Sequence, residues 1–370
     1  MRVALTVAML ASCMAICSFV ILGCQTNGAP EREAVEDAAP PAELVWEDGE
    51  HLIEAPETDR PAIRRTHMAM ATEYEIIAFP RTADEDTMAL IPIIEEAFRE
   101  IDDVDNRFST WKATSQATYV NNHAAERPVR VAPDFFDLVA RSKEHWETSM
   151  GAFDVTVGPL MELWGRYGDV DAVPSQAELE DVLQRVGMDK VELNPAERTI
   201  AFTEEGIQLD FGGIAKGYAV GLAADVLARY GVESALVNAG TSSITALGAP
   251  PGTDGWPVHI RHPYEPDARM DTVYLNGEAM STSGCYENLI DIGGDRVCDI
   301  IDPRDGRPVG HMLSVTAIGP DGADADAIST ALMVLGVDAA REFAQGRPGW
   351  RILVTAVPAD GAVEPERINF

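Results

Sequence analysis

The segment Leu209–Ala219, LDFGGIAKGYA, constrains the local fold more than any other stretch of this chain. An apolar run that contains one acid ends in two glycines, and a helical pattern begins directly afterwards. Gly212 and Gly213 allow close backbone approach, and a helix N-terminus attracts phosphate. The segment matches neither of the named glycine-rich nucleotide fingerprints. It predicts a strand–turn–helix joint whose glycines serve either tight packing or a phosphate ligand.

Around this joint, strand-like and helix-like segments are mixed without a regular βαβ alternation. Strand patterns cover Met70–Phe79, two runs within Val191–Leu209, Ser234–Gly240, most of Trp256–Val315, and Trp350–Ala356. Helical spacing covers Leu90–Phe108, Asp134–Thr148, Gln176–Val186, the residues after the joint to about Tyr230, Asp324–Leu335 and Asp338–Gln345. This order favours an α+β fold, with a mixed, largely antiparallel sheet and packed helices, over a doubly wound fold.

The N-terminal residues resemble a bacterial lipoprotein signal. Residues 1–23 contain one early arginine and an apolar run that is short for a membrane span, and Gly23 directly precedes Cys24. We expect cleavage before Cys24 and lipidation of that cysteine; the alternative is a plain membrane anchor in which Cys24 is incidental. Residues 24–65, rich in Ala, Pro and Glu, are expected to be a tether, and residues 66–370 the folded domain. The expected location is lipid-anchored on the periplasmic side of a bacterial membrane.

The charge of the chain excludes some partners. Its 370 residues carry a formal net charge of -33. Such an acidic chain repels nucleic acid and anionic lipid headgroups, so neither is an expected partner. A metal ion is not excluded.

Two cysteines remain if Cys13 and Cys17 leave with the signal and Cys24 carries lipid. Cys285 and Cys298 flank the turn-like sequence IGGD between two strand-like runs, which places them on adjacent hairpin strands. An exported domain permits their disulfide. Two free buried cysteines are the alternative.

Asp326 and Thr330 are spaced i and i+4 in a predicted helix and therefore share one face. A carboxylate and a hydroxyl there suit a hard cation such as Mg²⁺. The alternative is that Asp324 or Asp326 caps the helix and that Thr330 packs in the core. The histidines show no metal-ligand spacing, so a zinc site is not expected.

Three further motifs have both a functional and a structural interpretation. Asp154, in an apolar run, either caps a turn or binds a ligand. The aromatics of Phe108–Trp111 either stack on a flavin or adenine ring or belong to the core. The segment Asp299–Gly310 contains turn residues, and its charges could face solvent only.

The order of these motifs resembles the ApbE family of FAD:protein FMN transferases. The blocks MAT, FSTW, GAFDVTVGPLMELWG, LDFGGIAKGYAVG, VNAG, STSGCYEN, DIIDPRDGRPV and DADAISTALMVLG follow one another from Met70 to Gly336. The resemblance covers essentially all of the chain after the tether. It implies transfer of FMN from FAD to a threonine or serine of an acceptor flavoprotein, with release of AMP.

The resemblance also implies the site residues. It places Mg²⁺ on the carbonyl of Ala215 and the side chains of Asp326 and Thr330, where the ion engages the FAD pyrophosphate. It ties Asn121 to FAD turnover. The positions that it implies for FAD contact are Met70, Trp111, Ala152, Phe153, Asp154, Gly212 and Tyr218.

Three departures from the family pattern bear on activity. Ala71 stands where the family has glycine, and Thr241 and Ser242 replace a glycine and an acid. Asp299, also counted among the cofactor-binding positions, stands where the family usually has histidine; an aspartate can still accept a proton. The alternatives are therefore a lipoprotein that binds or hydrolyses FAD without acceptor transfer, and an acidic scaffold that binds no flavin.

Overall fold

The computed structural model describes residues 58, 60–166, 172–265, 268–286, 289–292, 295–358 and 363–370. All of them belong to the larger of two units in the chain, residues 49–370. The signal peptide, Cys24 and most of the tether lie outside the described residues. Among the helices that are described, none is both long and apolar enough to cross a membrane.

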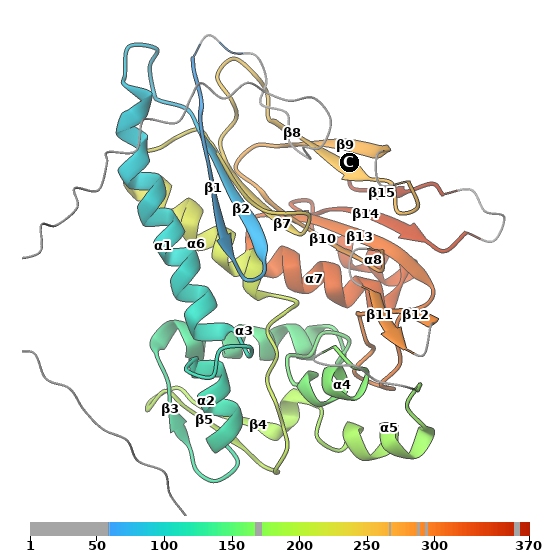
Figure 1. The fold of residues 1–370 in the computed structure, drawn as a ribbon. Helices are drawn as coiled ribbons and strands as arrows, with labels where there is room; N and C mark the ends of the chain where they lie inside the picture. The colour runs from blue at the N-terminus through green and yellow to red at the C-terminus, as the bar shows by residue number, and fades with distance from the viewer. Residues whose placement is uncertain are drawn as a thin grey trace, which may run out of the picture. The chain divides into compact units, whose positions relative to one another are not determined.

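The main sheet confirms the α+β prediction, because its neighbouring strands are all antiparallel (Figure 1). Its order is β1, β2, β6, β7, β10, β13, β14 and β15. The bounds are β1 Ile63–Ala69, β2 Thr72–Ala78, β6 Ala235–Ala239, β7 Ser243–Leu247, β10 Ala279–Gly284, β13 Met312–Gly319, β14 Arg351–Ala356 and β15 Glu366–Ile368.

Both faces of this sheet are covered. Successive strand residues point to opposite faces, so Ile76 packs under the helices and Ile77 packs under the hairpin of β8 and β9. The helices are α1 (Ile91–Phe108), α6 (Ala215–Arg229), α7 (Gly322–Leu335) and α8 (Val337–Ala344), and the hairpin strands are β8 (Trp256–Arg261) and β9 (Arg269–Leu275). Figure 1 shows α7 on one side of the central strands and β8–β9 on the other. Strands buried on both faces read as apolar runs, which is the pattern of β6 and β13.

The other elements form a second group, of which α4 (Gly158–Leu163) lines the cavity described below. This group also comprises α2 (Gln116–His123), α3 (Pro133–Thr148), α5 (Gln176–Leu183), the small sheet of β3 (Val129–Arg130), β4 (Val191–Asn194) and β5 (Thr199–Phe202), and the hairpin of β11 (Leu289–Ile292) and β12 (Asp295–Cys298). Two short 3₁₀ helices, η1 (Thr87–Leu90) and η2 (Met188–Lys190), complete the described elements.

Several features differ from the sequence prediction. β1 begins at Ile63, within the range predicted as tether. Met70 and Ala71 do not begin a strand; they form a two-residue turn between β1 and β2, with φ of 47° and 57°. Neither Asp324 nor Asp326 caps α7, because the Asp321 side chain accepts the backbone N–H of Asp324 and starts the helix earlier. Helix α2 lacks a wide apolar face, so its periodicity did not reveal it.

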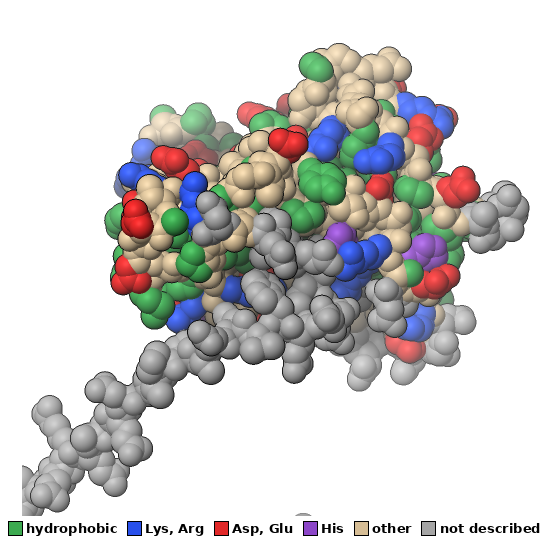
Figure 2. Space-filling model, turned by 90° about the horizontal axis from the view of Figure 1, so that it is seen from above, with side chains coloured by type: hydrophobic (Ala, Val, Ile, Leu, Met, Phe, Trp, Pro, Cys, Tyr) green, Lys and Arg blue, Asp and Glu red, His purple; other side chains and the backbone are tan. Residues whose placement is uncertain are grey.

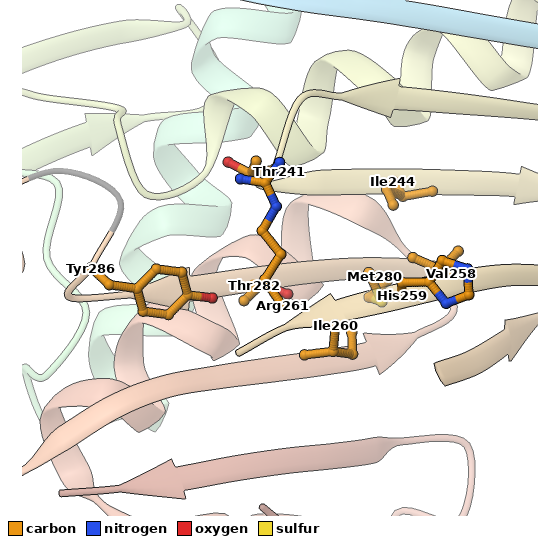
Figure 3. A pocket seen from close by; sticks show the side chains of 9 residues that line it. All are labelled: Thr241, Ile244, Val258, His259, Ile260, Arg261, Met280, Thr282 and Tyr286. Carbon is orange, nitrogen blue, oxygen red and sulfur yellow. The ribbon is translucent and has the colours of Figure 1, made fainter. Parts of the chain in front are cut away.

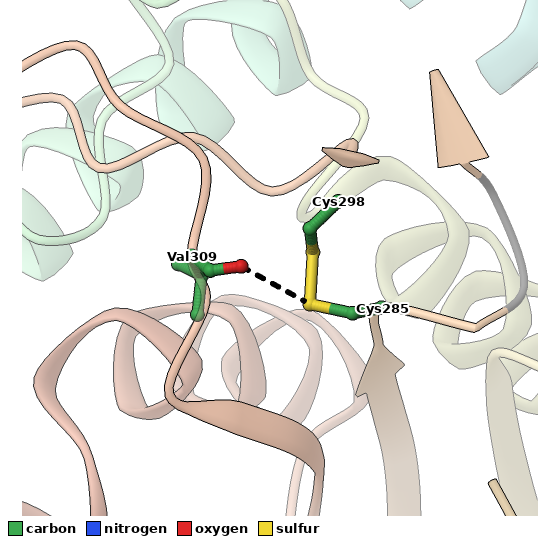
Figure 4. The surroundings of a disulfide bond; sticks show 3 residues. All are labelled: Cys285, Cys298 and Val309. Atoms are coloured by element: carbon green, nitrogen blue, oxygen red, sulfur yellow. Dashed lines mark hydrogen bonds between the residues drawn. A yellow bond between two sulfur atoms is a disulfide. The ribbon is translucent and has the colours of Figure 1, made fainter. Parts of the chain in front are cut away.

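Cys285 and Cys298 form a disulfide, as the sequence indicated (Figure 4). Their placement differs from the prediction in one respect. Cys298 ends β12, but Cys285 directly follows β10 of the main sheet and precedes β11. The bond therefore joins the main sheet to the β11–β12 hairpin rather than the two strands of that hairpin.

The acidic excess of the chain does not produce a uniform surface on the face shown in Figure 2. Acidic and basic side chains are interspersed there with apolar and polar ones. Any electrostatic preference for a partner at this face therefore depends on individual groups rather than on a broad field.

Candidate functional site

A cavity of about 840 Å³ lies among the turn between β1 and β2, the end of α1, the starts of α6 and α7, and the segment after β12. It brings together residues that lie far apart in the sequence. The site residues predicted from sequence that line it are Met70, Trp111, Ala152, Phe153, Asp154, Gly212, Ala215, Asp299, Asp326 and Thr330. This volume falls within the range of small-molecule and cofactor sites.

Asp326 is held rigidly at one wall of the cavity. Its side chain is buried, and its Oδ2 accepts the backbone N–H of Gly217 at 2.9 Å. Its Oδ1 accepts the hydroxyl of Ser281 at 2.8 Å. One turn further along α7, the Thr330 hydroxyl donates to the Asp326 carbonyl at 3.2 Å, which is the bond that a threonine makes inside a helix. The carboxylate and the hydroxyl therefore line the cavity in fixed orientations.

The close approach of α6 and α7 makes this geometry possible. A Cβ atom on Gly217 would lie 2.1 Å from the carbonyl oxygen of Gly322 and 2.7 Å from the Cβ of Asp326. A Cβ atom on Gly322 would lie 2.3 Å from the Gly217 carbonyl oxygen. Any side chain at either position would separate the helices and withdraw the N–H that Asp326 accepts.

The residues at this wall fit a hard cation. Among the residues that the structure describes, no lysine, arginine or histidine pairs with the Asp326 carboxylate, and a bound cation would offset the cost of burying its charge. Carboxylate, hydroxyl and carbonyl oxygens are suitable Mg²⁺ ligands. The described residues hold no group of three or more His, Cys, Asp or Glu that is arranged to hold a metal ion. A cation here would therefore complete its coordination with carbonyls, water or substrate phosphate, which is typical of Mg²⁺.

Asp299 lies at another wall, in an environment that favours its neutral form. Its side chain is 15% exposed, and Arg166 approaches its Oδ2 at 3.7 Å. Burial raises the pKa of Asp299 to about 6, while Arg166 and Lys216 act in the opposite direction and Asp210 adds to the rise. A carboxyl group with this pKa exchanges protons near neutral pH.

Asp154 has the structural role that its sequence context allowed, and its contact with a ligand stays a prediction. Its Oδ1 accepts the N–H of Thr156 at 2.7 Å and the Thr156 hydroxyl at 2.6 Å, so it caps a turn. It also lines the cavity. Burial raises the pKa of Asp154 to about 6, against the lowering effect of these hydrogen bonds.

Two aromatic positions differ in exposure at the cavity. Trp111 is 70% exposed and lines the cavity, so its ring offers a face for stacking. Phe108 is buried, and its ring stacks on Phe135 at 4.9 Å in the core. Phe108 therefore belongs to the core, and stacking of a flavin or adenine ring on Trp111 stays a prediction.

Asn121 and Tyr218 do not line the cavity. The Asn121 side chain donates to the Leu209 carbonyl at 3.0 Å and accepts the Leu209 N–H at 2.8 Å. It therefore supports the glycine-containing segment from behind. Tyr218 packs edge-on against Phe108, with ring centroids 5.8 Å apart. A flavin contact by either residue stays a prediction of the family resemblance.

Several contributing residues were not singled out from the sequence. Ser281 orients Asp326, and the Ser283 hydroxyl lies 3.1 Å from the Thr330 hydroxyl. Both serines occur in the block STSG, and alternate residues of a strand face the same side. That alternation is the sequence signal from which the two serines could have been identified.

A second, much smaller cavity of about 20 Å³ adjoins the first (Figure 3). The two cavities share Thr241 and Thr282. In Figure 3 the Arg261 side chain extends towards Thr241. The smaller space holds about one water molecule and is too small for a cofactor.

Comparison with known proteins shows the family. Residues 70–354 match the ApbE family. A FAD:protein FMN transferase of Klebsiella pneumoniae (strain 342) is 32% identical over 251 residues, which cover 66% of this chain and 71% of that protein. The enzyme of the same name from Escherichia coli (strain K12) is 31% identical over 254 residues, 67% of this chain and 72% of its own.

Solved structures of ApbE proteins are similar to this fold. The ApbE protein of Thermotoga maritima MSB8 superposes with a TM-score of 0.73 at 29% identity, over 82% of this chain and 96% of that one. The flavin transferase ApbE from Vibrio cholerae gives a TM-score of 0.72 at 26% identity, over 83% of this chain and 98% of its own.

Proposed function

Because the chain belongs to the ApbE family, we propose that it moves FMN from FAD to a threonine or serine hydroxyl of an acceptor flavoprotein, with Mg²⁺ bound and AMP released. Membership of this family of transferases makes the chain an enzyme that transfers flavin. The metal, the acceptor hydroxyl and the leaving group are our proposal. The observation that carries it is the buried Asp326 carboxylate, which lines the large cavity beside Thr330 without a side-chain cation among the described residues.

The cation site would be formed by Asp326, Thr330 and the carbonyl of Ala215. Mg²⁺ bound there would neutralise charge on the FAD pyrophosphate. The chain orients these ligands beforehand, through Ser281 and the Gly217 N–H on Asp326. Gly213 leaves room beside them, because a Cβ atom at that position would lie 3.3 Å from the Thr330 hydroxyl oxygen.

Asp299 is the proposed proton acceptor. The acceptor hydroxyl oxygen forms a bond to the FMN phosphorus, the bond from that phosphorus to the AMP oxygen breaks, and the hydroxyl proton passes to the Asp299 carboxylate. A pKa of about 6 leaves Asp299 largely ionised at pH 7 and still basic enough to accept a proton. In this role it does the work that a histidine would do at the same position. Trp111 provides an exposed ring on which the flavin stacks.

FAD hydrolysis to FMN and AMP is the second candidate. It is favoured by the same residue, because an acid that accepts a proton from a hydroxyl can accept one from water. The site would be shared, and only the nucleophile would differ.

The test follows both products in one reaction. The full chain is incubated with FAD, Mg²⁺ and an acceptor protein presenting a threonine, and AMP release and covalent protein fluorescence are measured together. Equal amounts of AMP and labelled acceptor support transfer. AMP without label supports hydrolysis. Neither product, with or without Mg²⁺, contradicts both.

The proposed location is the periplasmic side of a bacterial membrane, with Cys24 lipidated. The support is the pattern of residues 1–24 and the disulfide, which is usual in oxidising compartments. Mass spectrometry of the mature N-terminus tests it, since an unmodified Cys24 would contradict the anchor.

A further inference from the structure

The Cys285–Cys298 disulfide connects two walls of the large cavity. Gly284 precedes Cys285 and Asp299 follows Cys298, and both of these neighbours line the cavity. Each half of the bond is therefore one residue from the site. No step proposed above uses it.

The Cys285 side of the bond is fixed in the main sheet. Gly284 pairs with Ser314 of β13, and the Cys285 N–H donates to the Leu313 carbonyl at 3.0 Å. Ser283, two residues earlier, contacts the Thr330 hydroxyl at 3.1 Å. This end of β10 is thus tied to the wall that holds the proposed cation ligands.

The Cys298 side of the bond lies outside the main sheet. β12 pairs with β11 in a separate two-stranded sheet. Cys298 packs with α7 and β13, whereas Ile301 packs with the cluster around α4 and α5. Asp299 lies between Cys298 and Ile300, which both pack with the first cluster, and the chain passes to the second cluster at Ile301.

Among the described contacts, no hydrogen bond joins this segment to β10, although Ile300 and Val309 pack in the same apolar cluster as Cys285. The Val309 N–H donates to the Ile300 carbonyl at 2.9 Å, and Ile301 forms a single bridge with Pro308, so these bonds close the segment on itself. Figure 4 shows the Val309 carbonyl oxygen directed at the Cys285 sulfur, 3.8 Å away. Among the described contacts, the disulfide is the covalent connection between the Asp299 segment and β10.

We propose that Cys285 and Cys298 are positioning residues, whose disulfide fixes the Asp299 carboxyl opposite the wall that carries Thr330, so that flavin transfer requires the oxidised form. The inference rests on the proposed function, in which Asp299 accepts the proton. A displacement of about 1 Å in a reacting group is enough to reduce a rate by about a hundredfold. Reduction would leave the segment held by apolar packing, by the hydrogen bond from Trp164 Nε1 to the Gly306 carbonyl at 2.7 Å, and by Arg166 at 3.7 Å from Asp299.

The first experiment compares the oxidised full chain with the same chain reduced by a small dithiol. The dithiol donates two electrons and two protons to the cystine and becomes a cyclic disulfide. The double variant Cys285→Ser/Cys298→Ser serves as a reductant-independent equivalent. Both are expected to lower kcat at saturating FAD and Mg²⁺ at least tenfold, with the Kd for FAD changed less than threefold.

The second arm repeats the reduction in Asp299→Asn. If the bond acts through Asp299, this variant has a low kcat that reduction lowers no further. A bond that merely stabilises the fold would give the same fractional loss in both backgrounds. Leu275→Ala, a buried change in β9, is the control for stability. It should lower Tm and change kcat at 25 °C by less than about twofold.

Hydrogen exchange provides a readout without turnover. Reduction should accelerate exchange of the Val309 amide, while amides of β13 stay protected. An unchanged kcat on reduction, equal losses with and without Asp299, or unchanged Val309 exchange each overturns the inference. If the oxidised chain transfers no flavin, the proposed function fails, and Val309 exchange still decides whether the disulfide holds the segment.

Discussion

The wall that carries Asp326 and the wall that carries Asp299 border the same cavity, but different forces hold them in place. Asp326 is fixed by a backbone N–H, a serine hydroxyl and the contact between Gly217 and Gly322. Asp299 lies on a segment outside the main sheet, beside a disulfide, and within 3.7 Å of Arg166. The first wall is held by close helix packing and hydrogen bonds, and the second by apolar packing, a disulfide and a longer ion pair. Substitutions should therefore affect them differently.

The largest effect is expected at the packed wall. Asp326→Asn keeps the shape of the side chain but removes its charge, so Mg²⁺ affinity should fall and the transfer rate should drop at least about a hundredfold. Initial rates over a Mg²⁺ titration measure both effects. Asp338→Asn, an exposed change on α8, is the control. A variant with wild-type Mg²⁺ dependence would remove Asp326 from the cation site.

Gly217→Ala should disrupt the same wall by forcing apart the two helices that form it. Its Cβ would lie 2.1 Å from the Gly322 oxygen, so α6 and α7 must separate, with an expected loss of about 2–3 kcal/mol. Urea unfolding measures the loss. Gly221→Ala on the same helix is the matched control, because its Cβ meets nothing within 4 Å. That control should gain about 0.5–1 kcal/mol. Equal effects at the two glycines would rule out close packing as the cause.

Asp299→Asn tests the second wall through its pH dependence. The proposed base must be ionised, so the wild-type rate should rise as pH increases through about 6. The variant should be about tenfold slower at pH 8 and lack this rise. A pH profile of kcat from pH 5 to 8 measures both. An identical rise in the variant would assign the titration to another group.

The same substitution should increase stability. Burial raises the folded pKa of Asp299 to about 6, above its unfolded value of about 4. The folded chain therefore binds the proton more tightly, and this contribution to stability is present below pH 4 and lost as pH rises to about 6. At pH 8 the variant should gain about 2 kcal/mol, since its side chain carries no charge to bury. Denaturant midpoints at pH 4.5 and pH 8 give the comparison.

The smallest effect is expected at the turn between β1 and β2, which borders the cavity but belongs to neither wall. Ala71 has a φ of 57°, in the left-handed region that glycine adopts at little cost. Ala71→Gly should therefore stabilise the chain by about 0.5–1 kcal/mol and leave the rate nearly unchanged. Thermal unfolding measures it. A loss of stability would mean that packing of the Ala71 methyl group contributes more free energy than the left-handed backbone conformation costs.

Periodicity predicted the long elements well. The helix expected at Leu90–Phe108 is α1, because its apolar residues form one buried face. Periodicity failed where another force decides the backbone. Met70 and Ala71 are not turn-forming residues, so nothing in their identity predicts two left-handed conformations. The start of α7 also depends on a capping side chain, Asp321, and not on its apolar pattern.

Many of the residues that line the large cavity were predicted from the sequence, but their arrangement was not. The order of motifs selected Asp326 and Thr330, and the helical spacing put them on one face. Spacing could not show that Ser281 orients Asp326, because the two residues lie 45 positions apart and meet only when β10 lies beside α7. Nor could it show that Asp299 is buried.

Asn121 supports the glycine-containing segment from outside the cavity. Its amide offers one donor and one acceptor to Leu209, as a neighbouring strand would, and so replaces a strand with a single side chain. The shape of the segment that leads to Gly212 therefore depends on one amide group. Asn121→Asp removes the donor while keeping the size. We expect substitutions at position 121 to lower activity in a mutational scan, as substitutions in the cavity would. A map of ligand contacts would not include this residue, because it does not line the cavity.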